Sequence, residues 1–108
     1  MRLNDFIKSW LPLLLWMTVI FRMSSLPAKD IPPLFPLQDI CYHLAAYAIL
    51  GYLFRRAAKK NIRLTLIFCI AYALSDEFHQ IFIPGRSFSG FDLIIDGAGA
   101  FLGGLRYQ

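Results

Sequence analysis

The stretch "ALSDEFHQIFIPGRSFSGFDLIIDGAG", residues 73–99, places charged side chains inside two apolar segments joined by a short turn. With its neighbouring residues, each segment is long enough to form a helix. Charged groups in an apolar helix are costly unless they face one another or a solvated cavity. The stretch therefore predicts a helical hairpin whose polar groups point inward. Its charged or titratable groups are Asp76, Glu77, His79, Arg86, Asp92 and Asp96.

The composition indicates a membrane protein. Of 108 residues, 57% are hydrophobic and 16% aromatic, whereas only 17% are charged. The mean hydropathy is +0.53. A soluble domain of this size would need more charged surface than this chain can supply. We therefore expect an integral membrane protein.

Four apolar segments alternate with polar or proline-rich breaks, at residues 6–21, 39–54, 62–83 and 88–105. All but 62–83 are shorter than the roughly 20 residues that cross a bilayer, so tilted or partly re-entrant packing is expected. The first segment also resembles a signal peptide, but no small-residue cleavage site follows it. The fold predicted for residues 1–108 is one all-α domain, a bundle of about four short transmembrane helices.

Basic residues predict the orientation of this bundle. The loop "RRAAKKNIR", residues 55–63, contains five basic residues and no acid. By the positive-inside rule it is cytoplasmic, as are both termini, and the loops at 22–38 and 84–88 face outward. Such a run usually sets topology, so no nucleic-acid partner is expected, whereas contact with membrane lipids is. The expected location is the inner membrane, crossed several times.

Polar residues form one stripe on each of three predicted helices. Residues four apart drift slowly around one face of a helix, and the stripes should therefore face each other. In the predicted topology they meet near the outer surface and form a polar pocket. The stripes are Asp39, His43, Tyr47 and Gly51; Tyr72, Asp76, His79 and Gln80; and Asp92, Asp96, Gly99 and Gly103.

Some of these residues also have a purely structural interpretation. Asp39 follows a proline-rich loop and is a candidate N-cap, while Ser89 and Asp92 have the spacing of a capping box. "IPGR", residues 83–86, is typical of a tight turn with positive φ at its glycine. Gly99 and Gly103 form G-x-x-x-G, which favours close contact with a partner helix or a second copy of the chain.

Four residues lie too deep in their helices for capping. They are His43, Asp76, Glu77 and Asp96. The structural alternative for them is an internal ion pair with Arg86 or with a histidine. The functional alternative is that they form a catalytic or binding site.

The motifs together resemble the VanZ-like family of small bacterial membrane proteins, over about residues 21–105. The resemblance lies in D-x-x-x-H at 39–43, S-D-E-x-x-Q at 75–80, P-G-R at 84–86 and D-x-x-x-D-x-x-G at 92–99. Two positions differ from the usual family pattern. Ile40 stands where a lysine is common, and Asp96 where asparagine is frequent, which weakens Asp96 as a candidate general base.

The resemblance implies a role in the bacterial cell envelope, and the founding member is associated with resistance to the glycopeptide teicoplanin. Our first hypothesis is an enzyme acting on an amphipathic envelope lipid or lipid-linked glycan. The alternative is a non-enzymatic binder or transport accessory for a head group, a drug such as a glycopeptide, or a proton. A purely structural membrane subunit would leave the polar stripes unexplained. No P-loop, nucleophile elbow or zinc-protease motif is present.

Residue roles follow from side-chain chemistry. General acid–base catalysis requires a histidine or carboxylate within reach of the substrate, and arginine suits an anionic group. The catalytic candidates are Glu77, His43, His79 and Asp76; the substrate-binding candidates are Arg86, Gln80, Asp39, Asp92, Asp96 and Ser89. His43, His79, Asp76 and Asp92 are acceptable metal ligands, but their spacing is not diagnostic, so the cofactor stays open.

Overall fold

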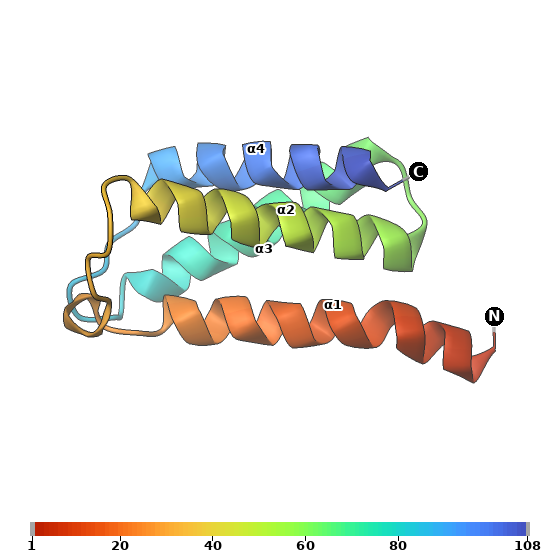
Figure 1. Cartoon of the computed structure of the whole chain (residues 1–108), viewed down its shortest axis with the longest axis horizontal. Coiled ribbons are helices and arrows are strands. Elements are labelled where there is room, and N and C mark those ends of the chain that lie inside the picture. The colour runs from red at the N-terminus through yellow and green to blue at the C-terminus, as the bar shows by residue number, and fades with distance from the viewer. Residues whose placement is uncertain (1, 108) are drawn as a thin grey trace.

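Helices run alternately up and down the long axis of the molecule, so that both termini lie at one end (Figure 1). The computed structural model describes residues 2–107 and contains no strand within that range. The predicted all-α class with four helices is therefore confirmed. The helices are α1 (Leu3–Ser24), α2 (Gln38–Ala58), α3 (Ile62–Gln80) and α4 (Gly90–Arg106), with a single 3₁₀ turn, η1 (Ala28–Asp30), between α1 and α2.

α1 is the helix in residues 2–107 whose length and composition suit a membrane span. It has 22 residues, which rise about 33 Å and match a hydrocarbon core of about 30 Å. α4 has only 17 residues. Crossing of the membrane by all four helices stays a prediction.

The helix ends differ from those predicted, for local reasons. α1 and α2 extend beyond 6–21 and 39–54. α3 ends at Gln80 rather than at 83, because the next residues form turns in which Ile83 N donates to Gln80 O. α4 begins at Gly90 rather than at 88, because Ser89 is its N-cap.

The two loops at the end opposite the termini are held by specific contacts. Gly85 has the positive φ predicted for "IPGR", at 77°, and Arg86 N closes the turn on Ile83 O. In the proline-rich loop, the Gln38 side chain accepts from Leu34 N at 2.7 Å and donates to Pro32 O at 2.9 Å. These bonds fix the loops over the end of the bundle.

α2 and α4 pack with their backbones in direct contact. A Cβ at Gly99 or Gly103 would collide with the backbone of α2, and one at Gly51 would collide with the carbonyl of Ala100. The G-x-x-x-G contact predicted for a partner helix or a second copy is thus made inside the chain, with α2. Association with a second copy of the chain stays a prediction. Gly99 and Gly103 cannot form its contact surface, because they already pack against α2.

α1 is the least enclosed helix. It contacts α2 and α3 but not α4. Large apolar side chains are exposed on all four helices, including Leu15, Ile49, Ile67 and Ile94. A soluble monomer rarely exposes so much contiguous apolar surface. This exposure agrees with a membrane environment.

Gly103→Ala should lower the thermal stability of the purified chain, because the added methyl group meets the backbone of α2, which cannot move aside as a side chain can. Overpacking of this kind costs about 1–3 kcal/mol. Gly97→Ala is the matched control, since its nearest neighbour is the flexible side chain of Ile70 at 3.8 Å. That variant should be neutral or slightly stabilising. Equal unfolding temperatures for the two variants would contradict the close α2–α4 contact.

Candidate functional site

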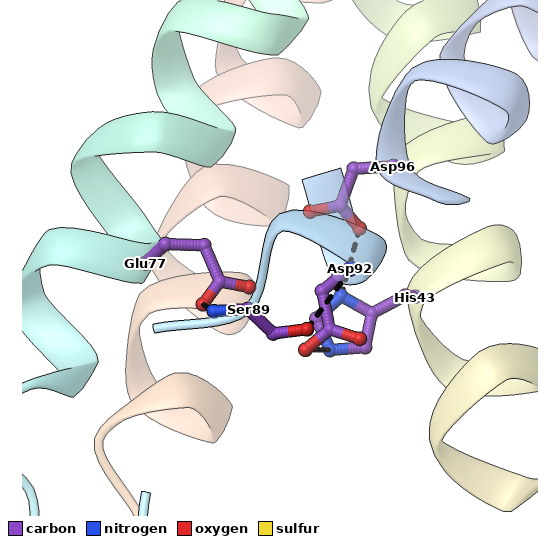
Figure 2. A network of polar contacts seen from close by, with 5 residues as sticks. All are labelled: His43, Glu77, Ser89, Asp92 and Asp96. Carbon is purple, nitrogen blue, oxygen red and sulfur yellow. Dashed lines mark hydrogen bonds and ion pairs between the residues drawn. The ribbon is translucent and has the colours of Figure 1, made fainter. Parts of the chain in front are cut away.

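Three helices bring polar side chains together at the end of the bundle that is covered by the two loops (Figure 2). His43 comes from α2, Glu77 from α3, and Asp92 and Asp96 from α4. We call these four residues the His43 cluster. The stripes predicted on α2 and α4 therefore do meet here. α3 contributes Glu77, which is not part of the stripe predicted on that helix.

His43 lies between two carboxylates of α4. Its Nδ1 is 2.7 Å from Asp96 Oδ1, and its Nε2 is 3.7 Å from Asp92 Oδ2. Asp92 and Asp96 are one helical turn apart and so share a face, which lets each approach a different ring nitrogen. The short contact with Asp96 fixes the ring, as the partner of the other nitrogen usually does for a functional histidine.

Ser89 joins α4 to Glu77. As predicted, its side chain caps α4, accepting from Asp92 N at 3.2 Å. In a complete capping box the acid three residues later, here Asp92, would accept from the N–H of the N-cap residue. Here Ser89 N donates instead to Glu77 Oε2, at 3.3 Å. The carboxylate of Asp92 is thereby left to face His43.

Gln80 and Arg86 extend the network toward the loops. The Gln80 amide, oriented to suit both neighbours, donates to Glu77 Oε2 at 3.2 Å and accepts from an Arg86 guanidinium nitrogen at 2.6 Å. Arg86 also donates to the carbonyl oxygen of Leu26 at 3.0 Å. Arg86 thus ties the 81–89 turn to the proline-rich loop.

The cluster has more acids than bases. Among residues 2–107, no lysine or arginine nitrogen lies within 4.0 Å of a carboxylate oxygen, and the acid–base contacts that exist belong to His43. The internal ion pair considered from the sequence is therefore made by a histidine and not by Arg86. One imidazole faces several carboxylates, so the cluster attracts cations.

Two predicted catalytic residues lie elsewhere. His79 Nε2 is 2.9 Å from Ser25 Oγ, and its ring stacks on Phe21. Asp76 is buried on the side of α3 that faces α1, and its Oδ1 has no hydrogen-bond partner within residues 2–107. The stripe predicted on α3 is thus divided, since Gln80 contacts Glu77 and Arg86 while Asp76 and His79 face α1.

Asp39 is exposed near the start of α2 and is not the N-cap considered from the sequence. That position is occupied by Leu37, which makes no side-chain capping bond. Asp39 instead lies at the rim of two cavities.

The two cavities adjoin at the His43 cluster. The first, about 290 Å³, lies under the loops and has mainly polar walls, among them His43, Arg86, Ser87 and Asp92. The second, about 370 Å³, runs between α1 and α2 and has mainly apolar walls, among them Val19, Met23, Ala45 and Ile49. His43, Gln80, Arg86 and Asp39 border both cavities. A polar chamber therefore continues into an apolar groove.

Tyr47, which the sequence placed on the polar stripe of α2, was not among the predicted catalytic or binding residues. It lines the apolar groove, is fully buried, and its hydroxyl has no hydrogen-bond partner within the described range. Its four-residue spacing from His43 was the available signal. Ser24, at the end of α1, borders the same groove, and its hydroxyl likewise has no hydrogen-bond partner within residues 2–107.

Comparison with protein families gives one match. The model of the family described as VanZ/LLP1 matches residues 9–108, which is nearly the whole chain. Comparisons with curated proteins and with solved structures give no match.

A double-mutant cycle of His43→Asn and Asp96→Asn should show strong coupling between the two side chains in the free energy of unfolding. Contacts between a buried histidine and a carboxylate this close typically couple by about 1–3 kcal/mol. The control cycle is His43→Asn with Asp92→Asn, whose atoms are 3.7 Å apart, and it should give a smaller coupling. Chemical unfolding of the purified variants in detergent measures both. A larger coupling for Asp92 would contradict the geometry.

Proposed function

Because the chain belongs to the VanZ/LLP1 family, we propose that it is an integral membrane protein of the bacterial cell envelope that acts on an amphipathic lipid or lipid-linked glycan. The exposed apolar side chains on all four helices support the membrane setting. α1, which is long and apolar enough to cross a membrane, also supports it.

The charge distribution supports an outward-facing site. Both termini and the α2–α3 loop lie at one end of the molecule, and the proline-rich loop and the 81–89 turn lie at the other (Figure 1). The His43 cluster lies beside these last two segments. Most of the 11 lysines and arginines lie at the end with the termini, and the positive-inside rule makes it cytoplasmic. These basic residues are Arg2, Lys8, Arg55, Arg56, Lys59, Lys60, Arg63 and Arg106.

The pair of adjoining cavities is the observation that carries the proposal. An amphipathic molecule needs a polar chamber for its head group and an apolar groove for its chain, and the two must be continuous. The groove between α1 and α2 has exposed apolar walls at Val19, Ala45 and Ile49, so a lipid chain reaches it sideways from the bilayer. Arg86 borders both cavities and suits a phosphate at the junction.

The head group would lie beside His43. In this proposal His43, Glu77 and Asp96 activate an oxygen nucleophile for transfer or hydrolysis at the head group. Gln80, Asp39 and Asp92 shape the chamber, and Ser89 acts through its cap on α4. Asp76 and His79 take no part in the proposed chemistry, because they face α1.

The alternative function is binding or transport without chemistry. The same cavities would serve it, and a lipoglycopeptide such as teicoplanin is itself amphipathic, with an acyl chain that suits the groove. Resistance would then follow from binding the drug. Turnover separates the two functions: conversion of a bound lipid by the purified protein rejects the binder, whereas stable binding without conversion rejects the enzyme.

Filling the groove should remove the lipid. Ala45→Phe places a ring among the groove walls and should lower the occupancy of co-purified lipid by about tenfold or more, because displaced chain contacts cost at least about 1.4 kcal/mol. Ala71→Phe is the matched control, since Ala71 is exposed on α3 and borders neither cavity. Native mass spectrometry measures the occupancy. Equal lipid content in both variants would contradict the groove as the chain site.

Cysteine labelling should verify the orientation. In a background of Cys41→Ala and Cys69→Ala, Ser87→Cys should react with a membrane-impermeant maleimide added to intact cells. Lys60→Cys, in the basic loop, should react only after the membrane is opened. The reverse pattern would place the site at the cytoplasmic face and overturn the positive-inside argument.

A further inference from the structure

The His43 cluster holds buried negative charge that the described side chains do not balance. Glu77 and Asp96 are each only 1% exposed, and Asp92 is beside them. His43 can offset one carboxylate at most, and Arg86 contacts none of them. Buried carboxylates without a counter-charge are strongly unfavourable, so this position demands a cation.

The geometry of three of these residues suits one ion. His43, Glu77 and Asp96 each offer a ligand atom, and these atoms lie within 4.8 Å of one another. Ligand atoms bound to one ion at about 2.0–2.2 Å must lie about 3–4.4 Å apart. Small side-chain movements would therefore form the site: His43 Nδ1 and Asp96 Oδ1, now 2.7 Å apart, must separate slightly, and the longer distances must shorten. The three ligands come from three different helices.

One oxygen of Glu77 is left for a ligand. Its Oε2 is held by Ser89 N and by the Gln80 amide. Its Oε1 is buried and has no hydrogen-bond partner within residues 2–107. Figure 2 shows this carboxyl group pointing from α3 toward α4 and His43. A carboxylate that is oriented through one oxygen and free at the other is typical of a metal ligand.

We propose that His43, Glu77 and Asp96 bind a divalent transition-metal ion, Zn²⁺ or Mn²⁺. Two carboxylates and a neutral imidazole balance the double charge of the ion. The imidazole nitrogen favours these ions over Mg²⁺ and Ca²⁺, which prefer oxygen ligands alone. Of the four metal ligands considered from the sequence, His43 is the one retained.

The second ring nitrogen also has a suitable partner. An ion bound at Nδ1, between the ring and Asp96, leaves Nε2–H to donate to Asp92, whose Oδ2 is 3.7 Å away. Histidines that bind metals usually donate their other N–H to such a carboxylate. Of the three ligands, His43 lines the polar chamber together with Arg86. A phosphate oxygen held beside Arg86 could therefore take a further coordination position.

Metal titration tests this inference without any lipid. The full chain is purified in detergent, stripped with a chelator, and titrated with Mn²⁺, followed by electron paramagnetic resonance, or with Zn²⁺, followed by metal analysis. We expect one ion per chain and a thermal midpoint that rises with ion concentration. Glu77→Gln and Asp96→Asn should each weaken the apparent affinity by about 100-fold or more, and His43→Asn similarly.

Two controls keep the test specific. His79→Asn removes a histidine of α3 that contacts Ser25, and Asp30→Asn removes an exposed acid from η1; both should bind the ion like the original chain. Absence of saturable binding would overturn the inference and leave protons as the balancing cations. Equal loss in His79→Asn, or full affinity in Glu77→Gln and Asp96→Asn, would overturn the ligand assignment.

X-ray absorption of the Zn²⁺-loaded original chain covers the case in which the variants fail to fold. One nitrogen ligand from imidazole with carboxylate oxygens is expected, and a coordination shell of sulfur or of water alone would overturn the inference. Lipid occupancy measured before and after chelation separates the outcomes. A metal-free chain that still carries lipid contradicts the metal site alone, whereas a metal-loaded chain without lipid contradicts the proposed function alone.

Discussion

The contact of α2 and α4 through their backbones determines the position of the whole site. Glycines at 51, 99 and 103 leave no side chain between the two helices, so their axes can approach closely. Asp96 lies one turn before this contact on α4, and His43 lies next to Leu44, whose carbonyl faces Gly99. The 2.7 Å distance between His43 and Asp96 therefore depends on residues that take no part in the polar network.

The start of α4 provides the second constraint. Ser89 uses its side chain to cap the helix and its N–H to hold Glu77 of α3, so that a single residue ties two helices together. In an ordinary capping box the acid three residues later would occupy that N–H. Here that acid is Asp92, and it is available to the imidazole. A change in capping partner thus supplies a polar group to the cavity.

The sequence was sufficient for features set by local periodicity. Apolar segments predicted the four helices, Gly85 the positive φ of its turn, and Ser89 the cap. It was insufficient where neighbouring helices decide. Asp76 and Glu77 are adjacent and differ by about 100° around α3, so which of them meets His43 depends on where α1 and α4 pack. The bond from Arg86 to Leu26 O likewise joins two loops 60 residues apart, and no local pattern indicates it.

The loops that cover the bundle have a consequence for how ligands arrive. Arg86 fastens the turn to the proline-rich loop at the end of the bundle opposite the termini, whereas the groove between α1 and α2 has exposed apolar walls. In the proposed function the chain of the lipid exchanges with the bilayer through this groove, although the polar chamber, with exposed Ser87 in its wall, is open to water. The relevant concentration is then the surface density of the lipid in its leaflet, which a hydrophobic chain raises far above its concentration in solution. Water-soluble fragments of the same molecule would lose that advantage and compete poorly, however well their polar groups match His43 and Arg86.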